Sequence, residues 1–265
     1  FEPSEFVHAR GDKLYVGLDD HLLYLRGMCF GNDVWGYTEI PVNHHNEADY
    51  QRVADMGMNV IRFYLNYITF ESDESPYHYK QTGWDWLNQN IAWAKEYNIY
   101  LILNIHVPQG GFQSNGEGLE LWNNPANQNR LAALWKEIAR RYADEKIIAG
   151  YNLLNEPVVP ESADQYKSLA QRMVNEIRKV DKNHLIIIER LLGVTGEWET
   201  YGNPAYTQFL VSDSQQNIMY DFHFYSPIEY THQNTPWTGF GEAGPYPDET
   251  AITFLAYKSI VGGFH

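Results

Sequence analysis

The stretch YNLLNEPVVP, residues 151–160, decides the fold and draws attention to one end of it. Its first half, Tyr151–Leu154, is mostly apolar, as expected of a strand that is buried on both faces. The run stops at Asn155, Glu156 and Pro157. The sequence therefore predicts an amide and a carboxylate held at the carboxyl end of a buried strand.

Similar apolar runs alternate with amphipathic stretches along the chain. The runs are Leu22–Arg26, Asn59–Leu65, Ile99–Ile105, Ile147–Leu154, His184–Glu189 and Ile218–Phe224. Helical spacing of apolar residues predicts helices at 46–56, 82–98, 126–145 and 162–180. Alternation of strand and helix indicates parallel strands joined by right-handed crossovers. An open doubly wound sheet and a closed (β/α)8 barrel both fit this pattern.

Polar residues at the ends of several runs favour the barrel. They are Arg62 in the second run, His106 after the third, Asn155 and Glu156 after the fourth, and His223 and Tyr225 at the sixth. In a barrel the carboxyl ends of the strands converge on one face, where the reactive residues lie. A plainer interpretation of Glu156 is a helix cap or a partner of Arg62, and a lone histidine is usually a hydrogen-bonded core residue.

Glu156 is the leading candidate for a reactive group. Half desolvated at the mouth of a barrel, its pKa is expected to rise toward neutrality, which suits a general acid. Trp237 lies in an aromatic loop rich in glycine and proline, and we interpret it as a platform that stacks on a sugar ring. Phe112 and Trp122, in the loop after His106, are weaker candidates for the same role.

Composition narrows the partners. The chain has 265 residues and a formal net charge of −15, which argues against nucleic acid or an anionic membrane and allows an uncharged substrate. Cys29 is the one cysteine, so no intrachain disulfide can form. Metal-ligand spacings such as HxxxH do not occur, and GFGEAG at 239–244 neither follows an apolar strand nor precedes a helix. We therefore expect no metal and no cofactor.

Taken in order, these motifs resemble the catalytic domain of glycoside hydrolase family 5, a family of (β/α)8 retaining glycosidases. The resemblance runs from the first strand to about Tyr246. It rests on NVIRFYL, LILNIH, LLNEP, FHFY and the loop PIEYTHQNTPW. The resemblance implies that Glu156 is the acid/base, that Asn155 binds the sugar 2-hydroxyl, and that Arg62, His106, His223, Tyr225 and Trp237 bind substrate.

The resemblance also implies a nucleophilic glutamate at the end of strand seven, held ionised by Arg62 and Tyr225. We recognise no strand seven, because residues 247–263 read as a helix after which the chain stops. Glu242 has the right neighbour, Gly241, but lies too soon after strand six for a crossover. We therefore expect one incomplete barrel domain over 1–265, with about six βα units. Its open edges predict self-association or a complementing fragment.

The sequence thus predicts an endo-acting retaining β-glycanase that hydrolyses β-1,4-glucan. A mannanase or another β-glucanase of the same family is the nearest alternative. A carbohydrate-binding protein that lacks the nucleophile, or an open-sheet oxidoreductase, are alternatives of other classes. The chain starts at Phe1 with no signal peptide, so a secreted or periplasmic location is expected from the function alone.

Overall fold

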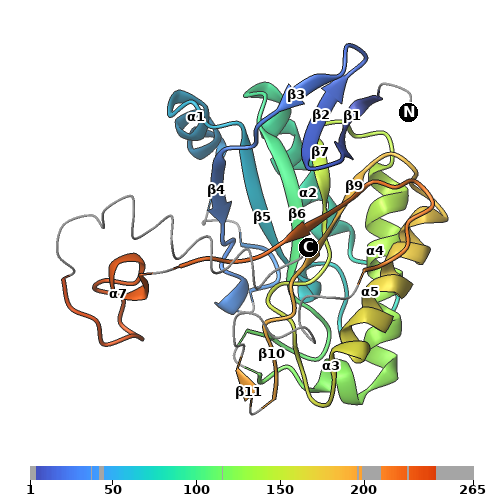
Figure 1. Ribbon diagram of the computed structural model, residues 1–265, viewed down its shortest axis with the longest axis vertical. Coiled ribbons are helices and arrows are strands. Elements are labelled where there is room, and N and C mark those ends of the chain that lie inside the picture. Colours follow the sequence, from blue (N-terminus) through green and yellow to red (C-terminus); the bar gives the residue numbers. More distant parts are fainter. Residues whose placement is uncertain are drawn as a thin grey trace.

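A sheet of six parallel strands forms the centre of the molecule (Figure 1). The computed structural model describes residues 4–36, 38–41, 45–114, 116–195, 197–198, 210–225 and 227–242. Within these ranges the strands are β4 (Gly27–Phe30), β5 (Val60–Asn66), β6 (Tyr100–Val107), β7 (Ile148–Asn152), β9 (Leu185–Glu189) and β12 (Ile218–Asp221). They pair in the order of the chain, whereas a doubly wound sheet reverses direction at a switch point. The barrel class is confirmed, and the open-sheet alternative is wrong.

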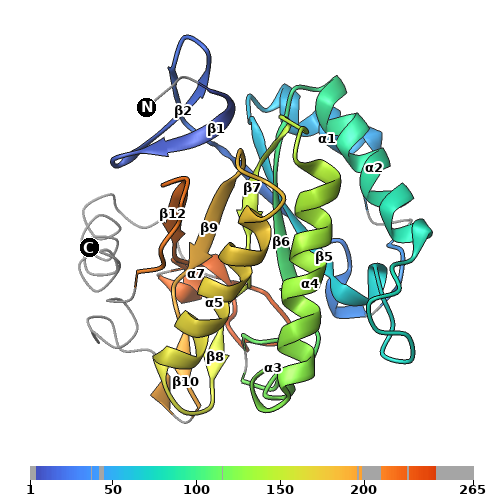
Figure 2. The same ribbon diagram turned by 90° about the vertical axis from the view of Figure 1, so that its right-hand side faces the viewer.

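Four predicted helices are confirmed, and they cover the outer face of the sheet (Figure 2). They are α1 (Glu47–Asp55), α2 (Gln81–Glu96), α4 (Pro125–Tyr142) and α5 (Ala163–Arg178). Local chemistry sets their starts: Asn46 forms a capping box with Asp49 at α1, and Asn124 caps α4 ahead of Pro125. The shorter elements are η1 (Val34–Gly36), η2 (Tyr67–Thr69), α3 (Glu120–Asn123), α7 (Ile228–Thr231), β8 (Val158–Val159), β10 (Gly193–Val194) and β11 (Glu197–Trp198).

Alternation along the strands separates the core from the site. On β5, Ile61, Phe63 and Leu65 are fully buried in the main apolar core, which the helices complete. Arg62 and Tyr64 lie between them and therefore point to the other, inner side of the sheet. The same alternation directs inward the polar side chains near the carboxyl ends of other strands: Asn104, His106, Asn152, Glu189 and Asp221.

A three-stranded antiparallel sheet covers the amino ends of the parallel strands (Figure 2). It comprises β1 (Ser4–Arg10), β2 (Lys13–Gly17) and β3 (His21–Leu23). Val7 of β1 packs on Ala149, Leu185 and Ile187 and fills the inner side of the parallel sheet at that end. The prediction that Leu22–Arg26 is the first parallel strand is wrong. Leu22 and Leu23 belong to this additional sheet, and the first parallel strand begins at Gly27.

No helix within the described ranges combines the length and the apolar character that crossing a bilayer requires.

Candidate active site

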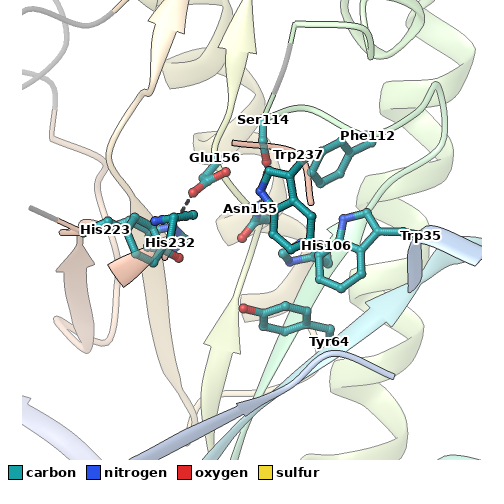
Figure 3. A pocket seen from close by; sticks show the side chains of 11 residues that line it. Trp35, Tyr64, His106, Phe112, Ser114, Asn155, Glu156, His223, His232 and Trp237 are labelled. Carbon is teal, nitrogen blue, oxygen red and sulfur yellow. Dashed lines mark hydrogen bonds and ion pairs between the residues drawn. The ribbon is translucent and has the colours of Figure 1, made fainter. Parts of the chain in front are cut away.

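A cavity of about 690 Å³ opens at the carboxyl ends of the parallel strands. Its lining is mostly aromatic and histidine side chains: Trp35, Tyr64, His106, Phe112, Ser114, Asn155, Glu156, His223, Tyr225, His232 and Trp237. Figure 3 shows Glu156 and His223 facing each other on one side and the rings of Trp35, Phe112 and Tyr64 on the other. Of the predicted site residues, the cavity brings together His106, Asn155, Glu156, His223, Tyr225 and Trp237. An apolar cleft with a few convergent polar groups suits an uncharged ring-shaped ligand.

Arg62 lies beneath the cavity and ties three strands together. Its guanidinium donates to Oδ1 of Asn152 at 2.7 and 3.0 Å, to Oδ1 of Asn155 at 3.0 Å and to Oε2 of Glu189 at 3.1 Å. Asn155 in turn donates from Nδ2 to the Ser114 hydroxyl at 3.1 Å. The amide of Asn155 is therefore held at both ends, with its orientation set by Arg62.

Glu156 adopts an uncommon backbone conformation, with a φ of +41°. A non-glycine residue in the left-handed region is strained, and such residues cluster at functional sites. Its backbone N–H donates to Oε1 of Glu189 at 2.7 Å, and its carboxylate lies 2.7 Å from Nδ1 of His223. The strand-end carboxylate is thus fixed by one backbone contact and one side-chain contact.

The expectation of a raised pKa at Glu156 is wrong. Burial alone would raise it, but the hydrogen bond and positive charge of His223, with help from Ser114, lower the pKa to about 2. Burial would also lower the pKa of His223, yet the charge of Glu189 and the hydrogen bond to Glu156 raise it above the ordinary value. These opposite shifts favour a carboxylate on Glu156 and a proton on the His223 side of their hydrogen bond.

Glu189 is a site residue that sequence reasoning missed. It ends β9, is 2% exposed, and accepts from both Arg62 and the backbone of Glu156. Its Oε1 lies 3.4 Å from Nε2 of His223. Burial raises the pKa of Glu189 to about 7, against the opposing charges of His223 and Arg62. The sequence did contain a signal for Glu189: it is a charged residue at the carboxyl end of an otherwise apolar strand, as Asn155 follows the apolar run before it.

His106 and the aromatic residues form the opposite wall. The His106 ring stacks on Tyr64 with centroids 3.9 Å apart, and Trp35 meets the same ring edge-on at 5.2 Å. Burial, reinforced by the charge of Arg62, holds the pKa of His106 well below its usual value, so the ring is neutral. Sequence reasoning missed Trp35, which lies in none of the quoted motifs, and Tyr64, which lies within NVIRFYL but resembles one more residue of an apolar strand.

Of the aromatic candidates, Trp237 and Phe112 line the cavity and Trp122 does not. Trp237 is 77% exposed, so its ring is accessible for stacking on a flat ligand. Trp122 is 5% exposed in the main core and donates from Nε1 to Gln113, so its interpretation as a sugar platform is wrong. Tyr225 meets His223 and His232 edge-on, at centroid distances of 6.1 and 5.1 Å.

Glu242, the candidate nucleophile, is exposed and is not among the described residues that line the cavity. The acidic partner of Arg62 is Glu189, at the end of β9. The predicted helix at 247–263 lies outside the described residues. The identity of the nucleophile stays a prediction.

Glu189, Asp221 and His223 offer ligand atoms within 4.8 Å of one another, a spacing compatible with a metal ion. The guanidinium of Arg62, 3.1 Å from Glu189, already supplies positive charge at this point. A divalent cation would be repelled by it and would compete for an occupied carboxylate. We therefore assign these side chains to the hydrogen-bonded network of Arg62.

Comparison with known proteins agrees with the family resemblance found in the sequence. Residues 22–256 match the family model described as cellulase, glycosyl hydrolase family 5. Endoglucanase C of Acetivibrio thermocellus is 30% identical over 192 residues, covering 72% of this chain and 53% of that protein. Cellodextrinase A of Ruminococcus flavefaciens is 26% identical over 198 residues, covering 74% of this chain and 56% of that protein. The chain thus spans about half the length of these relatives.

The fold has a solved counterpart. The structure of endoglucanase Cel5A from Thermotoga maritima superposes with a TM-score of 0.67 at 25% identity. The match covers 89% of this chain and 74% of that one. The fold is therefore shared over most of this chain.

Proposed function

Because this chain belongs to the cellulase family, glycosyl hydrolase family 5, we propose that it acts as an endo-acting retaining β-glycanase on β-1,4-glucan. The observation that carries the proposal is Glu156, fixed at a strand end beside Asn155 and facing the cavity with His223 at 2.7 Å. Glu156 is the acid/base in this proposal, and Asn155 binds the sugar 2-hydroxyl. The endoglucanase relative supports glucan as the substrate.

The proton for the leaving group comes from the pair of Glu156 and His223. The low pKa of Glu156 and the raised pKa of His223 favour a resting pair in which the proton lies on the histidine side of their hydrogen bond. When a glucan chain covers the cavity and excludes water, the neutral form of the pair gains stability, and the proton moves from Nδ1 to the carboxyl. Glu156 then protonates the glycosidic oxygen, as the acid/base of a retaining enzyme must.

Retention requires a second carboxylate about 5 Å from the first, acting as nucleophile. Glu242 remains our candidate within this chain. For it to serve, the loop that carries it must close over the cavity when substrate binds. A secreted or periplasmic location accompanies the proposal, because a polymeric glucan is met outside the cell.

The test is release of reducing ends from soluble β-1,4-glucan, β-mannan and mixed-linkage glucan by the 265-residue chain. Preferential hydrolysis of β-1,4-glucan supports the proposal. Preferential hydrolysis of mannan would replace the substrate with the nearest alternative. Binding of any of these glycans without release of reducing ends would contradict the enzymatic part.

A binding role without turnover is the second candidate, and one observation favours it. Among the described residues, the carboxylate that lines the cavity is that of Glu156, and Arg62 pairs with Glu189 below it. A cavity that stacks sugars needs no nucleophile. Quenching of tryptophan fluorescence by cello-oligosaccharides, in the absence of any product, would identify this role.

Replacing Trp237 by Ala should weaken binding of cello-oligosaccharides about tenfold, because an exposed stacking surface is lost at the cavity rim. Affinity measured by calorimetry provides the readout. Tyr24→Ala is the matched control, since Tyr24 is 64% exposed and does not line the cavity. Equal affinities of the parent and Trp237→Ala would rule out the stacking role.

A further inference from the structure

Glu189 touches the candidate acid/base by two separate routes. Its Oε1 accepts the backbone N–H of Glu156 at 2.7 Å, where the chain has a φ of +41°. The same oxygen lies 3.4 Å from Nε2 of His223, whose other nitrogen is 2.7 Å from the Glu156 carboxylate. Glu189 itself is 2% exposed and does not line the cavity, so it acts from beneath the site.

We propose that Glu189 is a positioning residue for the acid/base: it holds the backbone of Glu156 and fixes which nitrogen of His223 gives up a proton. The inference rests on the proposed function for the role of Glu156. It adds a residue on β9, a strand to which the sequence motifs assigned no part.

The first route acts on geometry. A left-handed conformation at a glutamate is strained, so a contact must hold it. The hydrogen bond from the Glu156 N–H to Glu189 is short, at 2.7 Å, and its acceptor side chain is 2% exposed, as such a contact should be. Without it, the strand end would relax and the Glu156 carboxylate would turn away from His223.

The second route acts on the proton. In the imidazolium form, Nδ1–H points at Glu156 and Nε2–H faces Glu189. Transfer breaks the Nδ1–H bond, leaves its electron pair on Nδ1 and forms an O–H bond on Glu156. The proton on Nε2 stays, because Oε1 of Glu189 faces that nitrogen. An aspartate that orients a catalytic histidine in serine hydrolases follows the same logic.

Other charged groups surround this pair and set its balance. The titratable and charged side chains that face Glu189 and His223 include Arg62 on β5, His106 on β6, Glu156 after β7, Asp221 on β12 and Tyr225 after β12. Arg62 opposes protonation of His223, and Glu156 supports it. The charge of Glu189 is the largest single effect that raises the pKa of His223, ahead of the hydrogen bond to Glu156.

Glu189→Gln should therefore lower the pKa of His223 by about one pH unit, the smaller end of what a neighbouring opposite charge produces. The titration is followed by NMR of the full chain with labelled histidine, and the His223 signal is assigned from a His223→Asn sample. In an active chain, the alkaline limb of kcat/KM should move down by the same amount. The value of kcat should fall while KM stays unchanged, because Glu189 lies outside the cavity wall.

Two further variants separate positioning from simple loss of stability. Glu71→Gln removes another fully buried glutamate that pairs with an arginine, Arg130 at 2.9 Å, and should leave the His223 titration and the pH profile unchanged. Glu189→Asp keeps the charge and should keep the pKa of His223 near that of the parent.

The titration does not depend on hydrolysis, so the two proposals fail separately. A fall in the His223 pKa in Glu189→Gln supports the inference even if no glycan is cleaved, in which case the proposed function fails alone. An unchanged His223 pKa in folded Glu189→Gln would overturn the inference, whatever the activity. An equal shift of the His223 pKa in Glu71→Gln would overturn it as well. If Glu189→Gln does not fold, Glu189→Asp provides the test. A fall of about one pH unit in the His223 pKa of Glu189→Asp would then overturn the inference.

Discussion

Replacing Glu156 by Gln is expected to reduce hydrolysis of β-1,4-glucan by about 10²–10⁴-fold, the contribution typical of a positioned acid/base. The amide cannot pass a proton from His223 to the glycosidic oxygen, although it can keep the hydrogen bond that now joins them at 2.7 Å. Binding of the glucan should persist, because the aromatic walls of the cavity are unaltered. The loss should therefore fall on kcat.

The leaving group provides a sharper form of this experiment. An aryl cellobioside with a strongly acidic phenol needs little protonation to depart, so its glycosylation step should suffer far less in Glu156→Gln than that of the polysaccharide. Glu161→Gln is the matched control, because Glu161 is an exposed glutamate in the loop before α5. Equal losses on the aryl glycoside and on the glucan would contradict the acid/base role.

Replacing Arg62 by Met is expected to destabilise the protein by about 3–5 kcal/mol at pH 8, the effect of leaving a buried charge without its partner. Arg62 donates to Asn152, Asn155 and the buried Glu189. Unfolding in urea, followed by circular dichroism, measures the change. Lys95→Met, which breaks the exposed pair with Glu145, should change stability by less than about 1 kcal/mol.

The destabilisation should depend on pH with a definite sign. The folded-state pKa of Glu189, about 7, exceeds its ordinary value of 4.5, so folding binds a proton at this group. The stability from this group is present below pH 4.5 and is lost as pH rises to 7. Without Arg62 the pKa rises further and the decline continues above 7. The deficit of Arg62→Met should therefore be smaller at pH 5 than at pH 8, and Glu189→Gln in the same chain should recover part of it. A deficit independent of pH would contradict this.

The sequence predicted the strands and helices where periodicity and burial agree. The runs from Asn59 to Leu65 and from Ile99 to Ile105 are apolar because both faces are covered, and their positions hold within two residues. The prediction of a parallel strand at Leu22–Arg26 was wrong, because a short apolar run in an antiparallel sheet has the same composition as a buried parallel strand. The polar alternation of β1 and β2 was too irregular to predict that sheet.

Site residues at strand ends could be predicted from the sequence, whereas their tertiary partners could not. Asn155 and Glu156 stood out because Pro157 interrupts the apolar run, and the cavity includes both. The charge state of Glu156 depends on His223, 67 residues away, so burial alone gave the wrong direction for its pKa. Glu189 went unnoticed because a glutamate that ends a strand is ordinary until its neighbours on β5 and β12 are known.

The central claim is that this cavity cleaves β-1,4-glucan with retention, using Glu156. The most direct test is proton NMR of cellopentaose during the first minutes of reaction with the 265-residue chain, with Glu156→Gln beside it. We expect the β-anomer of the new reducing end to appear first in the parent and no comparable product in the variant. First appearance of the α-anomer, or equal rates in the two chains, would contradict the claim.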